Sequence, residues 1–581
     1  MQAAHRGDRP TLLRPPLGGP PTGMTGFLRI PPFHRSVPVL ARARQDTAPA
    51  FPVADAERDE LAERICRERV GGCFWAPAPT QRRPVLVVLS RTARARHRAV
   101  AMLKHVLAAH PARDVLLVRR GPAEAASGLA GRLGIAHAPW QSDPHALLDG
   151  VTRVYADSVG DVVRLAALRD LPVVLGADGG QEQPLLRADV LADLLDRTDY
   201  VSPYSSAPIP CAEAITLLAD WRRTILVNRQ IGACLGMSRW KRRRIADFLA
   251  QAPGAPPFIP AFRAGPPGAI AVWATRLPPG LEDDARRAGT PLWRVEDGFV
   301  RSIGLGSALM PPSSITLDTR GIYYDPARES DLEHILATAS FGPALRARAR
   351  RLTDSLVRLG ISKYGAGQAA RVSEAWDSGD RRTILVPGQV ADDQSVRCGG
   401  GRIGGNLELL QAVRRHNPDA FIVYRPHPDV EATHRLGHME DSVVMQLADR
   451  IDRGGAILDT IARVDEVHTL TSLAGFEALM RGRRVVTYGA PFYAGWGLTV
   501  DLGDVPARRT RRLSLEDLVA GVLILFPRYL DPVTRLPCGP EVLIDRLQTP
   551  DLWRPTPWMR ALAAQTALRK AWARIRSARP A

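Results

Sequence analysis

The chain contains 581 residues, about four times the length of a typical domain, so two to four folded units are expected. Charged residues make up 24% and hydrophobic residues 45% of the chain, a globular mixture that excludes general disorder. Lysine and arginine together number 78 against 60 acidic residues. The formal charge of +18 favours anionic partners such as phosphates, sugar acids or a lipid surface. Because the basic residues are dispersed and no aromatic-basic platform is evident, nucleic acid is not an expected partner.

The six cysteines are scattered along the chain, and none of them forms a C-x-x-C pair. This pattern argues against a zinc site and a disulfide scaffold, and it fits a reducing compartment. No run reaches the roughly 18 apolar residues that a membrane-spanning helix needs. The basic N-terminus lacks the apolar segment of a secretion signal. We therefore expect a cytoplasmic protein, or one on the inner face of a membrane.

Short β-rich runs alternate with helical patterns along most of the chain, which is typical of parallel sheets covered by helices on both faces. We therefore expect an α/β fold, with a linker in the Pro/Gly-rich stretch 252–268. The predicted strands are residues 84–90, 114–121, 151–158, 171–180, 268–274, 290–299, 381–389, 420–428, 464–472 and 483–491.

The sequence also contains an internal repeat. Residues 151–176 parallel residues 464–489, and residues 199–221 resemble residues 528–547. Two units of similar architecture are therefore expected in tandem. The first unit lacks the polar residues that single out the second.

Two adjacent acids, Glu296 and Asp297, end a predicted strand and precede Gly298. Carboxylates at the C-terminal edge of a parallel sheet face the crevice where such folds bind ligands. Because neighbouring strand residues point to opposite faces, we expect one acid to enter the cleft and the other to brace the loop. Such a carboxylate can act as a nucleophile or a general base. The alternative is an exposed turn with two solvated acids. Ser302, in the same segment, is a further candidate substrate contact.

Another predicted strand ends in Arg425, His427 and Pro428. The proline restricts His427 to an extended conformation that directs the imidazole away from the strand end. An arginine fork and a histidine hydrogen bond suit a phosphate oxygen. The alternative is a histidine with a purely structural hydrogen bond.

Thr471 or Ser472 can cap the helix that follows a third strand, and the free N–H groups of such a helix can bind an anion. Glu477, in the second turn, could reach ribose hydroxyls. The alternative is simple capping with Glu477 on a solvated face.

Two further loops carry candidate ligand contacts. Gly388 and Gln389 follow a strand in a loop that matches neither the Walker pattern nor G-x-G-x-x-G. Tyr493 and Trp496 lie in a Gly-flanked loop and could stack on a base or a sugar, although packing within the loop is an equal alternative.

Residues 558–576 combine arginines with tryptophans and leucines, a pattern typical of a helix in an anionic membrane interface. A solvated tail helix is the alternative.

The ordered motifs "EDGFVRSIGLG", "VPGQVADDQS", "YRPHPD", "TLTSLAGFEALMRGRRVVTYGAPFYAGWGLT" and "PRYLDPVTRLPC" closely resemble the KpsC/LipA family of capsular polysaccharide biosynthesis proteins, which are bacterial β-Kdo glycosyltransferases. The resemblance covers about residues 236–547 and, more faintly, residues 69–221. It implies a GT-B fold with two Rossmann-like domains facing a cleft. It also implies CMP-Kdo as the donor and a phosphatidylglycerol-based glycolipid primer for capsule export as the acceptor.

The family is retaining and is thought to pass through a covalent sugar–enzyme adduct. The resemblance therefore implies that Asp297 is the nucleophile or base and that Glu296 supports it. His427-Pro428 would contact the CMP phosphate, and Ser472 with its helix would hold the nucleotide. We expect no metal and no cofactor, because Arg425, His427 and the helix N-terminus would meet the phosphate charge.

Family members usually carry two complete modules, whereas here the first has no equivalent of these motifs. We therefore expect a degenerate Rossmann-like unit from a truncated, inactive first module, and a partner such as a second Kdo transferase or the capsule export complex on the inner membrane face. Two alternatives remain: a non-catalytic scaffold of a capsule assembly complex, and a transferase for another CMP-sugar acid.

The expected parts are a disordered lead-in (1–50), the degenerate unit (51–235), the acceptor-side domain with the acids (236–375), the donor-side domain (376–550) and the basic amphipathic tail (551–581).

Overall fold

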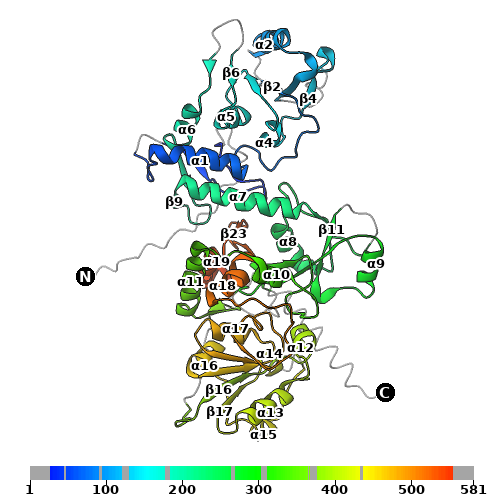
Figure 1. Cartoon of the computed structure of the whole chain (residues 1–581), viewed down its shortest axis with the longest axis vertical. Helices are drawn as coiled ribbons and strands as arrows, with labels where there is room; N and C mark the ends of the chain where they lie inside the picture. Colours follow the sequence, from blue (N-terminus) through cyan, green and yellow to red (C-terminus); the bar gives the residue numbers. More distant parts are fainter. Residues whose placement is uncertain are drawn as a thin grey trace, which may run out of the picture. The chain divides into compact units, whose positions relative to one another are not determined.

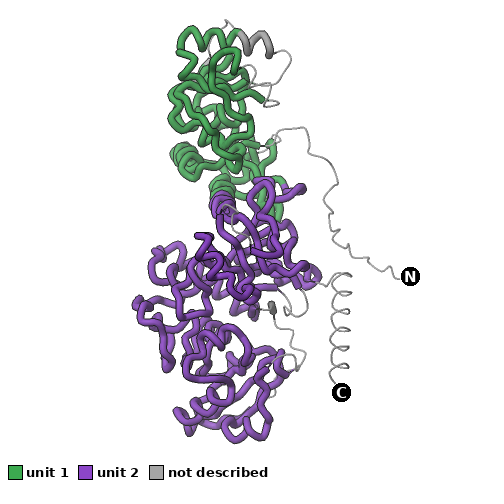
Figure 2. The backbone as a smooth tube through the Cα atoms, turned by 90° about the vertical axis from the view of Figure 1, so that its right-hand side faces the viewer, with its two compact units in different colours: residues 1–30, 39–219 green, residues 31–38, 220–581 purple. Residues whose placement is uncertain are grey.

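A computed structural model describes residues 26–44, 48–89, 95–120, 130–176, 183–262, 268–302, 310–363, 365–366, 376–431 and 436–553 of the chain. The chain forms two compact units, shown in different colours in Figure 2. Residues 1–30 and 39–219 make up the first unit, and residues 31–38 and 220–581 make up the second.

The first unit is built on a six-stranded sheet in the order β4-β3-β2-β5-β6-β7, in which only β7 is antiparallel to its neighbour. The central strand β2 reads VLVVL and is buried along its whole length, as expected of a strand covered on both faces. The strands are β2 (Val85–Leu89), β3 (Val115–Arg119), β4 (Ala136–Ala138), β5 (Arg153–Ala156), β6 (Val173–Leu175) and β7 (Gln183–Pro184).

The helices of the first unit include α1 (Asp55–Glu68), α2 (Ala95–Ala109), α4 (Pro144–Leu147), α5 (Asp161–Leu168) and α6 (Arg187–Leu195). A small antiparallel sheet follows, formed by β1 (Ala41–Ala43), β8 (Thr198–Val201) and β9 (Pro208–Ile209). Helix α7 (Cys211–Asn228) then continues into the second unit.

The second unit contains two six-stranded sheets. The first has the order β10-β11-β12-β13-β22-β23, and it is parallel only between β10, β11 and β12. Its strands are β10 (Ile231–Leu235), β11 (Ala269–Trp273), β12 (Leu292–Asp297), β13 (Ser314–Asp318), β22 (Arg528–Leu530) and β23 (Pro537–Cys538). Helices α8 (Arg239–Phe248), α9 (Leu281–Arg287), α10 (Asp331–Thr338) and α11 (Pro343–Arg358) accompany it.

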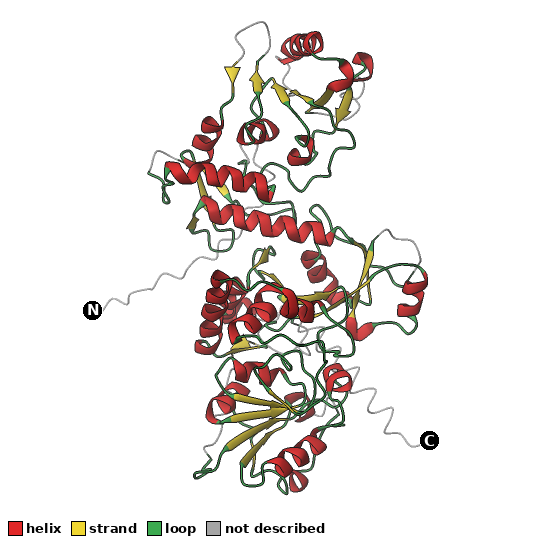
Figure 3. Cartoon of the chain, in the orientation of Figure 1, coloured by secondary structure: helices red, strands yellow, loops and turns green. Residues whose placement is uncertain are grey.

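The second sheet is fully parallel, in the order β18-β17-β16-β19-β20-β21. Its strands are β16 (Thr383–Pro387), β17 (Phe421–Arg425), β18 (Arg450–Ile451), β19 (Glu466–Thr469), β20 (Arg484–Thr487) and β21 (Val500–Asp501). Its helices lie on both faces (Figures 1 and 3), and they include α12 (Gln394–Gly399), α13 (Asn406–His416), α14 (Pro428–Glu431), α15 (Asp441–Val444), α16 (Ile457–Arg463) and α17 (Leu473–Leu479).

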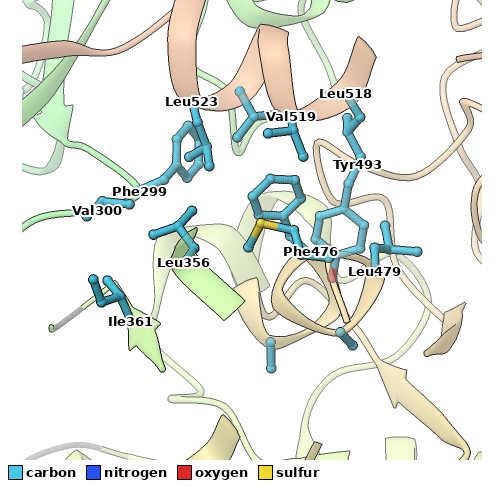
Figure 4. Packing of buried hydrophobic residues seen from close by; sticks show 14 of the residues in the cluster. Phe299, Val300, Leu356, Ile361, Phe476, Leu479, Tyr493, Leu518, Val519 and Leu523 are labelled. Atoms are coloured by element: carbon cyan, nitrogen blue, oxygen red, sulfur yellow. The ribbon is translucent and has the colours of Figure 1, made fainter. Parts of the chain in front are cut away.

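One hydrophobic core joins the two halves of the second unit. It combines Phe299 and Val300, which follow β12, with the apolar faces of α11 and α17 and with α18 (Leu515–Val519). Figure 4 shows Phe476 and Tyr493 packed in this core. After the second sheet, the chain continues through α18, a π-helical turn (Ala520–Leu525), the β22–β23 hairpin and α19 (Pro540–Leu547). The core fixes the end of β12 relative to the second sheet.

The alternation of strands and helices predicted from the sequence is found, and each predicted strand contains an observed one. Three predicted boundaries differ. The lead-in predicted over 1–50 is folded in part, since β1 pairs with β8. Strand β10 belongs to the second unit, so the first unit ends at residue 219, before the predicted 235. The β22–β23 hairpin joins the first sheet of the second unit, although it follows the strands of the second sheet in sequence.

The stretch 252–268 is not a linker between units. It connects α8 to β11 inside the second unit, and Pro257 accepts a hydrogen bond from the N–H of Cys234 at 2.8 Å. The basic tail predicted over 551–581 lies, from residue 554 on, outside the described residues.

Candidate active site

A cavity of about 650 Å³ lies within the second unit, between its two sheets. Glu296, Tyr324 and Lys363 line it on the side of the first sheet. His427 and Ser472 line it on the side of the second sheet. The two turns singled out in the sequence, at residues 296–298 and 427–428, therefore meet at one cavity.

Glu296 is the member of the acidic pair that lines this cavity. Its Oε1 accepts the N–H of Asp297 at 3.1 Å, and its buried Oε2 has no hydrogen-bond partner among the described residues. Burial, with the neighbouring charge of Asp297 as a second cause, raises the pKa of Glu296 to about 7. A carboxyl group with this pKa can both release and accept a proton near neutral pH.

Two cations hold the carboxylate of Asp297. Lys241 Nζ lies 3.5 Å from Oδ1, and Arg301 Nε lies 2.9 Å from Oδ2. Asp297 is not among the residues that line the cavity, but its side chain is 20% exposed. The pair therefore divides as predicted, with one acid in the cleft and the other in the ion pairs that brace the loop.

Lys241 is itself held in place by aromatic rings. Its Nζ lies 3.4 Å from the centroid of the Trp273 ring, and burial lowers the pKa of this lysine. Lysine occurs in this arginine-rich chain only at positions 104, 241, 363 and 570. Two of these lysines lie at the acidic pair, because Lys363 also lines the cavity. This rarity was a signal in the sequence that pointed to both residues.

His427 lies opposite, on the turn that follows β17. Its Nδ1 accepts the N–H of Asp429 at 3.1 Å. Since an accepting Nδ1 carries no proton in the neutral imidazole, Nε2 is the protonated nitrogen and serves as a donor. Pro428 also lines the cavity and begins α14.

Arg425 lines the cavity, and protein groups already bind its guanidinium. Its guanidinium binds Asp452 at 2.8 Å, the carbonyls of Gly454 and Gly455 at 2.6 Å each, and Thr460 at 3.0 Å. These bonds use both terminal nitrogens. Arg425 therefore shapes the loop at Gly455, which also lines the cavity, and its contact with a phosphate stays a prediction.

Gln389 ties together the loops that follow β16 and β19. Its Nε2 donates to Thr471 Oγ1 and its Oε1 accepts the N–H of Thr471, each at 3.0 Å. At Gly388 a β-carbon would come within 2.5 Å of the Tyr424 hydroxyl, so only glycine fits. Ser472 caps α17 as predicted and accepts the N–H of Ala474 at 3.2 Å. All of these loops line the cavity.

Glu477 is buried and lines the cavity, so it does not lie on a solvated face. Its Oε1 accepts the N–H of Lys363 at 3.3 Å, which links helix α17 to the segment after α11. Burial raises the pKa of Glu477 to about 7. A partly protonated carboxyl can both donate to and accept from a hydroxyl.

Comparison with known proteins gives the chain its family. The model of a family described as "Capsule polysaccharide biosynthesis protein" matches residues 268–360 and 346–529. The lipopolysaccharide-processing protein LpsZ of Rhizobium meliloti is 37% identical over 338 residues, which are 56% of this chain and 76% of LpsZ. The chain belongs to the capsule polysaccharide biosynthesis family.

Other members of this family are similar over the same part of the chain. The capsule polysaccharide modification protein LipA of Neisseria meningitidis serogroup A is 40% identical over 352 residues, which are 59% of this chain and 49% of LipA. The chain thus spans about half the length of LipA. A solved structure titled "Thermosulfurimonas dismutans KpsC, beta Kdo 2,7 transferase" is 35% identical and covers 54% of this chain and 97% of its own, with a TM-score of 0.44. The structure titled "Thermosulfurimonas dismutans KpsC, beta Kdo 2,4 transferase" is 32% identical and covers 54% of this chain and 98% of its own, with a TM-score of 0.48.

Three predicted substrate contacts are buried in this family member. Ser302 is fully buried, accepts a hydrogen bond from Arg301 at 2.9 Å and is not among the cavity-lining residues. Tyr493 and Trp496 are also fully buried, and Figure 4 shows Tyr493 inside the core. Tyr493 donates to the Ser472 carbonyl at 2.6 Å, and the Trp496 indole donates to the Phe492 carbonyl at 2.9 Å. The alternative of loop packing is therefore correct for both aromatic residues.

The aromatic residues that do line the cavity come from other segments. They are Phe299, Tyr323, Tyr324 and Phe492. Tyr323 packs edge-on against Phe299 and Phe492, whose tilted rings have centroids 4.8 Å apart. The predictions from the sequence missed these residues, since nothing in their local pattern separates them from core aromatics. They give one wall of the cavity an apolar surface.

The raised pKa of Glu296 predicts a pH-dependent stability. The ordinary glutamate value of 4.5 applies to the unfolded chain, so between pH 4.5 and 7 the folded protein keeps a proton that the unfolded chain has lost. Stability is therefore lost as pH rises through this range. Glu296→Gln removes this effect, and we expect the variant to exceed the wild type by about 1–3 kcal/mol at pH 8 and to match it at about pH 4. Urea unfolding at both pH values measures the difference; equal differences at both would contradict the burial of a protonated carboxyl.

The burial of Trp496 predicts a structural phenotype. We expect Trp496→Ala to lower the free energy of unfolding by about 3–5 kcal/mol, because it leaves a large cavity in the core. Trp496→Phe, which keeps most of the buried volume, serves as the control and loses less. Urea unfolding gives the stability, and calorimetric titration of the Phe variant gives the CMP affinity. If Trp496→Ala left the stability unchanged and Trp496→Phe lost the affinity for CMP, the alternative in which Trp496 stacks on the ligand would be correct.

No helix among the described residues combines the length and apolar character that a membrane crossing requires.

Proposed function

We propose that the second unit is a retaining glycosyltransferase that moves Kdo from CMP-Kdo to a phosphatidylglycerol-based glycolipid primer of capsular polysaccharide. The observation that carries the proposal is the shared cavity, in which Glu296 and His427 face one ligand-sized space in a member of a capsule polysaccharide family. Carboxylates and an imidazole on opposite sides of a cleft suit cleavage of a sugar–phosphate bond.

The donor phosphate lies against His427 in this proposal. Nε2–H donates to a phosphate oxygen and stabilises the charge that develops as CMP leaves. The local geometry supports this role, because the bond from Asp429 to Nδ1 fixes the proton on Nε2. Thr471, Ser472 and Glu477 contact the nucleotide, with Glu477 at the ribose hydroxyls. The proposal assigns no role to a metal or a cofactor.

The two acids take different steps of a double displacement. The carboxylate of Asp297, held charged by Lys241 and Arg301, turns from these ion pairs into the cavity beside Glu296 and attacks the anomeric carbon; the bond from that carbon to the phosphate oxygen breaks, and CMP leaves with the electron pair. In the second step an acceptor hydroxyl attacks the same carbon and its proton passes to Glu296, while the bond to Asp297 breaks. Two inversions give net retention. The pKa of about 7 suits Glu296 for this proton transfer.

A transfer assay with CMP-Kdo and a synthetic phosphatidylglycerol glycolipid tests the proposal. We expect a β-linked product, identified by mass and NMR, and no product when a CMP-linked sialic acid replaces CMP-Kdo. If transfer occurs only from another CMP-sugar acid, that compound takes the place of CMP-Kdo as the donor. If the chain neither transfers a sugar nor binds CMP, the result would support the alternative of a scaffold in a capsule assembly complex.

The lipid acceptor predicts an interaction with the inner membrane face, where a second Kdo transferase and the capsule export complex would be partners. The basic residues of 556–581, outside the described residues, are proposed to supply it. We expect the full chain to float with vesicles that contain about 30% of the anionic lipid phosphatidylglycerol. The chain that lacks residues 556–581 should lose most of this binding. Flotation that is unchanged by the deletion would remove the tail from the proposal.

A further inference from the structure

The two units of the chain contain the same arrangement of strands. The sheet order β4-β3-β2-β5-β6-β7 of the first unit corresponds, strand by strand, to β18-β17-β16-β19-β20-β21 of the second. In each sheet the first strand in sequence, β2 or β16, lies third in the order. The next two strands, β3 and β4 or β17 and β18, lie on one side of it, and the remaining three lie on the other. Only the last strand differs, since β7 is antiparallel and β21 parallel.

The segment after each sheet is duplicated down to single hydrogen bonds. Tyr200 begins a hairpin in the first unit and pairs with Ile209, and Tyr529 pairs with Cys538 in the second. Each tyrosine hydroxyl donates to the carbonyl six residues before it: Tyr200 to Leu194 at 3.0 Å, and Tyr529 to Leu523 at 2.8 Å. A coincidence of fold class does not produce the same side-chain bond at the same register.

This register identifies the first-unit counterpart of the catalytic turn. Tyr200 pairs on its other side with Ala41, and Tyr529 pairs with Ser314. A β-carbon on Gly26 would lie 3.0 Å from the Ala41 β-carbon, and one on Gly298 would lie 2.7 Å from the Ser314 β-carbon. Gly26 therefore occupies the position of Gly298. The sequences that follow, GFLR at 26–29 and GFVR at 298–301, agree with this assignment.

The assignment shows what has replaced the acids. The residues before Gly298 are Glu296 and Asp297, whereas those before Gly26 are Met24 and Thr25, neither of which ionises as a carboxylate. The arginine of the motif has changed partner accordingly. Arg301 pairs with Asp297, whereas Arg29 lies 2.7 Å from Asp161, the first residue of α5.

The donor-side residues are replaced as well. Strands β17 and β3 both end in arginine, and the second residue after the strand is His427 in one unit and Gly121 in the other. Helix α17 carries Glu477, whereas α5 has no acid after Asp161. The two acids, the histidine and the buried glutamate of the proposed mechanism are therefore absent from the corresponding sequence of the first unit.

We infer that the first unit is a duplicated transferase module without catalytic residues, and that this chain carries out its transfer at a single centre, the cavity lined by Glu296 and His427. The inference rests on the proposed function. It means that a second, different sugar linkage in the product must come from another transferase acting before or after this one.

The test compares matched substitutions in the two units of the full chain. We expect Glu296→Gln/Asp297→Asn to lose transfer from CMP-Kdo by at least about 1,000-fold, and Met24→Gln/Thr25→Asn at the corresponding positions to keep wild-type rates. Transfer that persists in the first variant, or falls equally in the second, would overturn the inference.

Calorimetric titration with CMP separates this inference from the proposed function. We expect one CMP per wild-type chain, and one CMP of reduced affinity in His427→Ala. Two CMP per chain, or a single site whose affinity His427→Ala leaves unchanged, would overturn the inference even if the wild type transferred another sugar. An absence of CMP binding would overturn both the donor assignment and the inference built on it.

Discussion

Asp297→Asn is expected to abolish the formation of CMP from CMP-Kdo, with a loss of at least about 1,000-fold in kcat. The amide has no charge with which to attack the anomeric carbon, although its size and position between Lys241 and Arg301 are preserved. The affinity for CMP should stay within about threefold of the wild type, because Asp297 makes no contact with the nucleotide in the proposal. Release of CMP measured in the absence and presence of acceptor checks the prediction.

The matched variant is Glu296→Gln. It should slow transfer to the acceptor by about 100- to 10,000-fold through loss of the proton acceptor, while the first step still releases one CMP per enzyme in a burst. This contrast assigns the two acids. A burst in Asp297→Asn and none in Glu296→Gln would exchange their roles, and full activity in both variants would remove the pair from catalysis.

His427→Ala has the second largest expected effect, a loss of about 100- to 1,000-fold in kcat/KM. The alanine removes the hydrogen bond from Nε2 to the departing phosphate, a bond that strengthens as the charge develops. The loss should appear mainly in kcat when CMP-Kdo is saturating. Steady-state kinetics with CMP release as the readout give both constants.

His427→Gln provides the control, because the amide nitrogen of glutamine reaches close to the position of Nε2. We expect it to recover part of the activity lost in the alanine variant. Equal rates for the alanine variant and the wild type would mean that the phosphate binds elsewhere. A change confined to KM would limit His427 to ground-state binding.

Much of this site could be predicted from the sequence, because the relevant rules are local. Apolar runs locate strands, and polar residues at the ends of parallel strands meet at one edge of a sheet. Glu296, His427, Ser472 and Glu477 were found in this way, and all four line the cavity.

The errors arose where a distant partner decides the role. Arg425 lines the cavity as predicted for a donor contact, but its bonds to Asp452 and to the carbonyls of Gly454 and Gly455 could not be predicted from the local sequence. Tyr493 and Trp496 look like a stacking pair because glycines flank them, but the core between the two sheets takes up both rings.

The remnant in the first unit was hidden for a related reason. The segment at 26–29 follows a Pro/Gly-rich stretch and carries none of the acids by which the second copy is recognised. Only the pairing of Ala41 with Tyr200, more than a hundred residues away, aligns it with the second copy. Long-range strand pairing has no signature in the local sequence.

The most direct measurement is a crystal structure of the Asp297→Asn variant with CMP-Kdo bound. The account predicts the phosphate within hydrogen-bond distance of His427 Nε2, and the anomeric carbon between that phosphate and the side chain at position 297, with Glu296 beside the sugar. A donor bound outside the cavity, or one whose sugar points away from residues 296 and 297, would contradict the account.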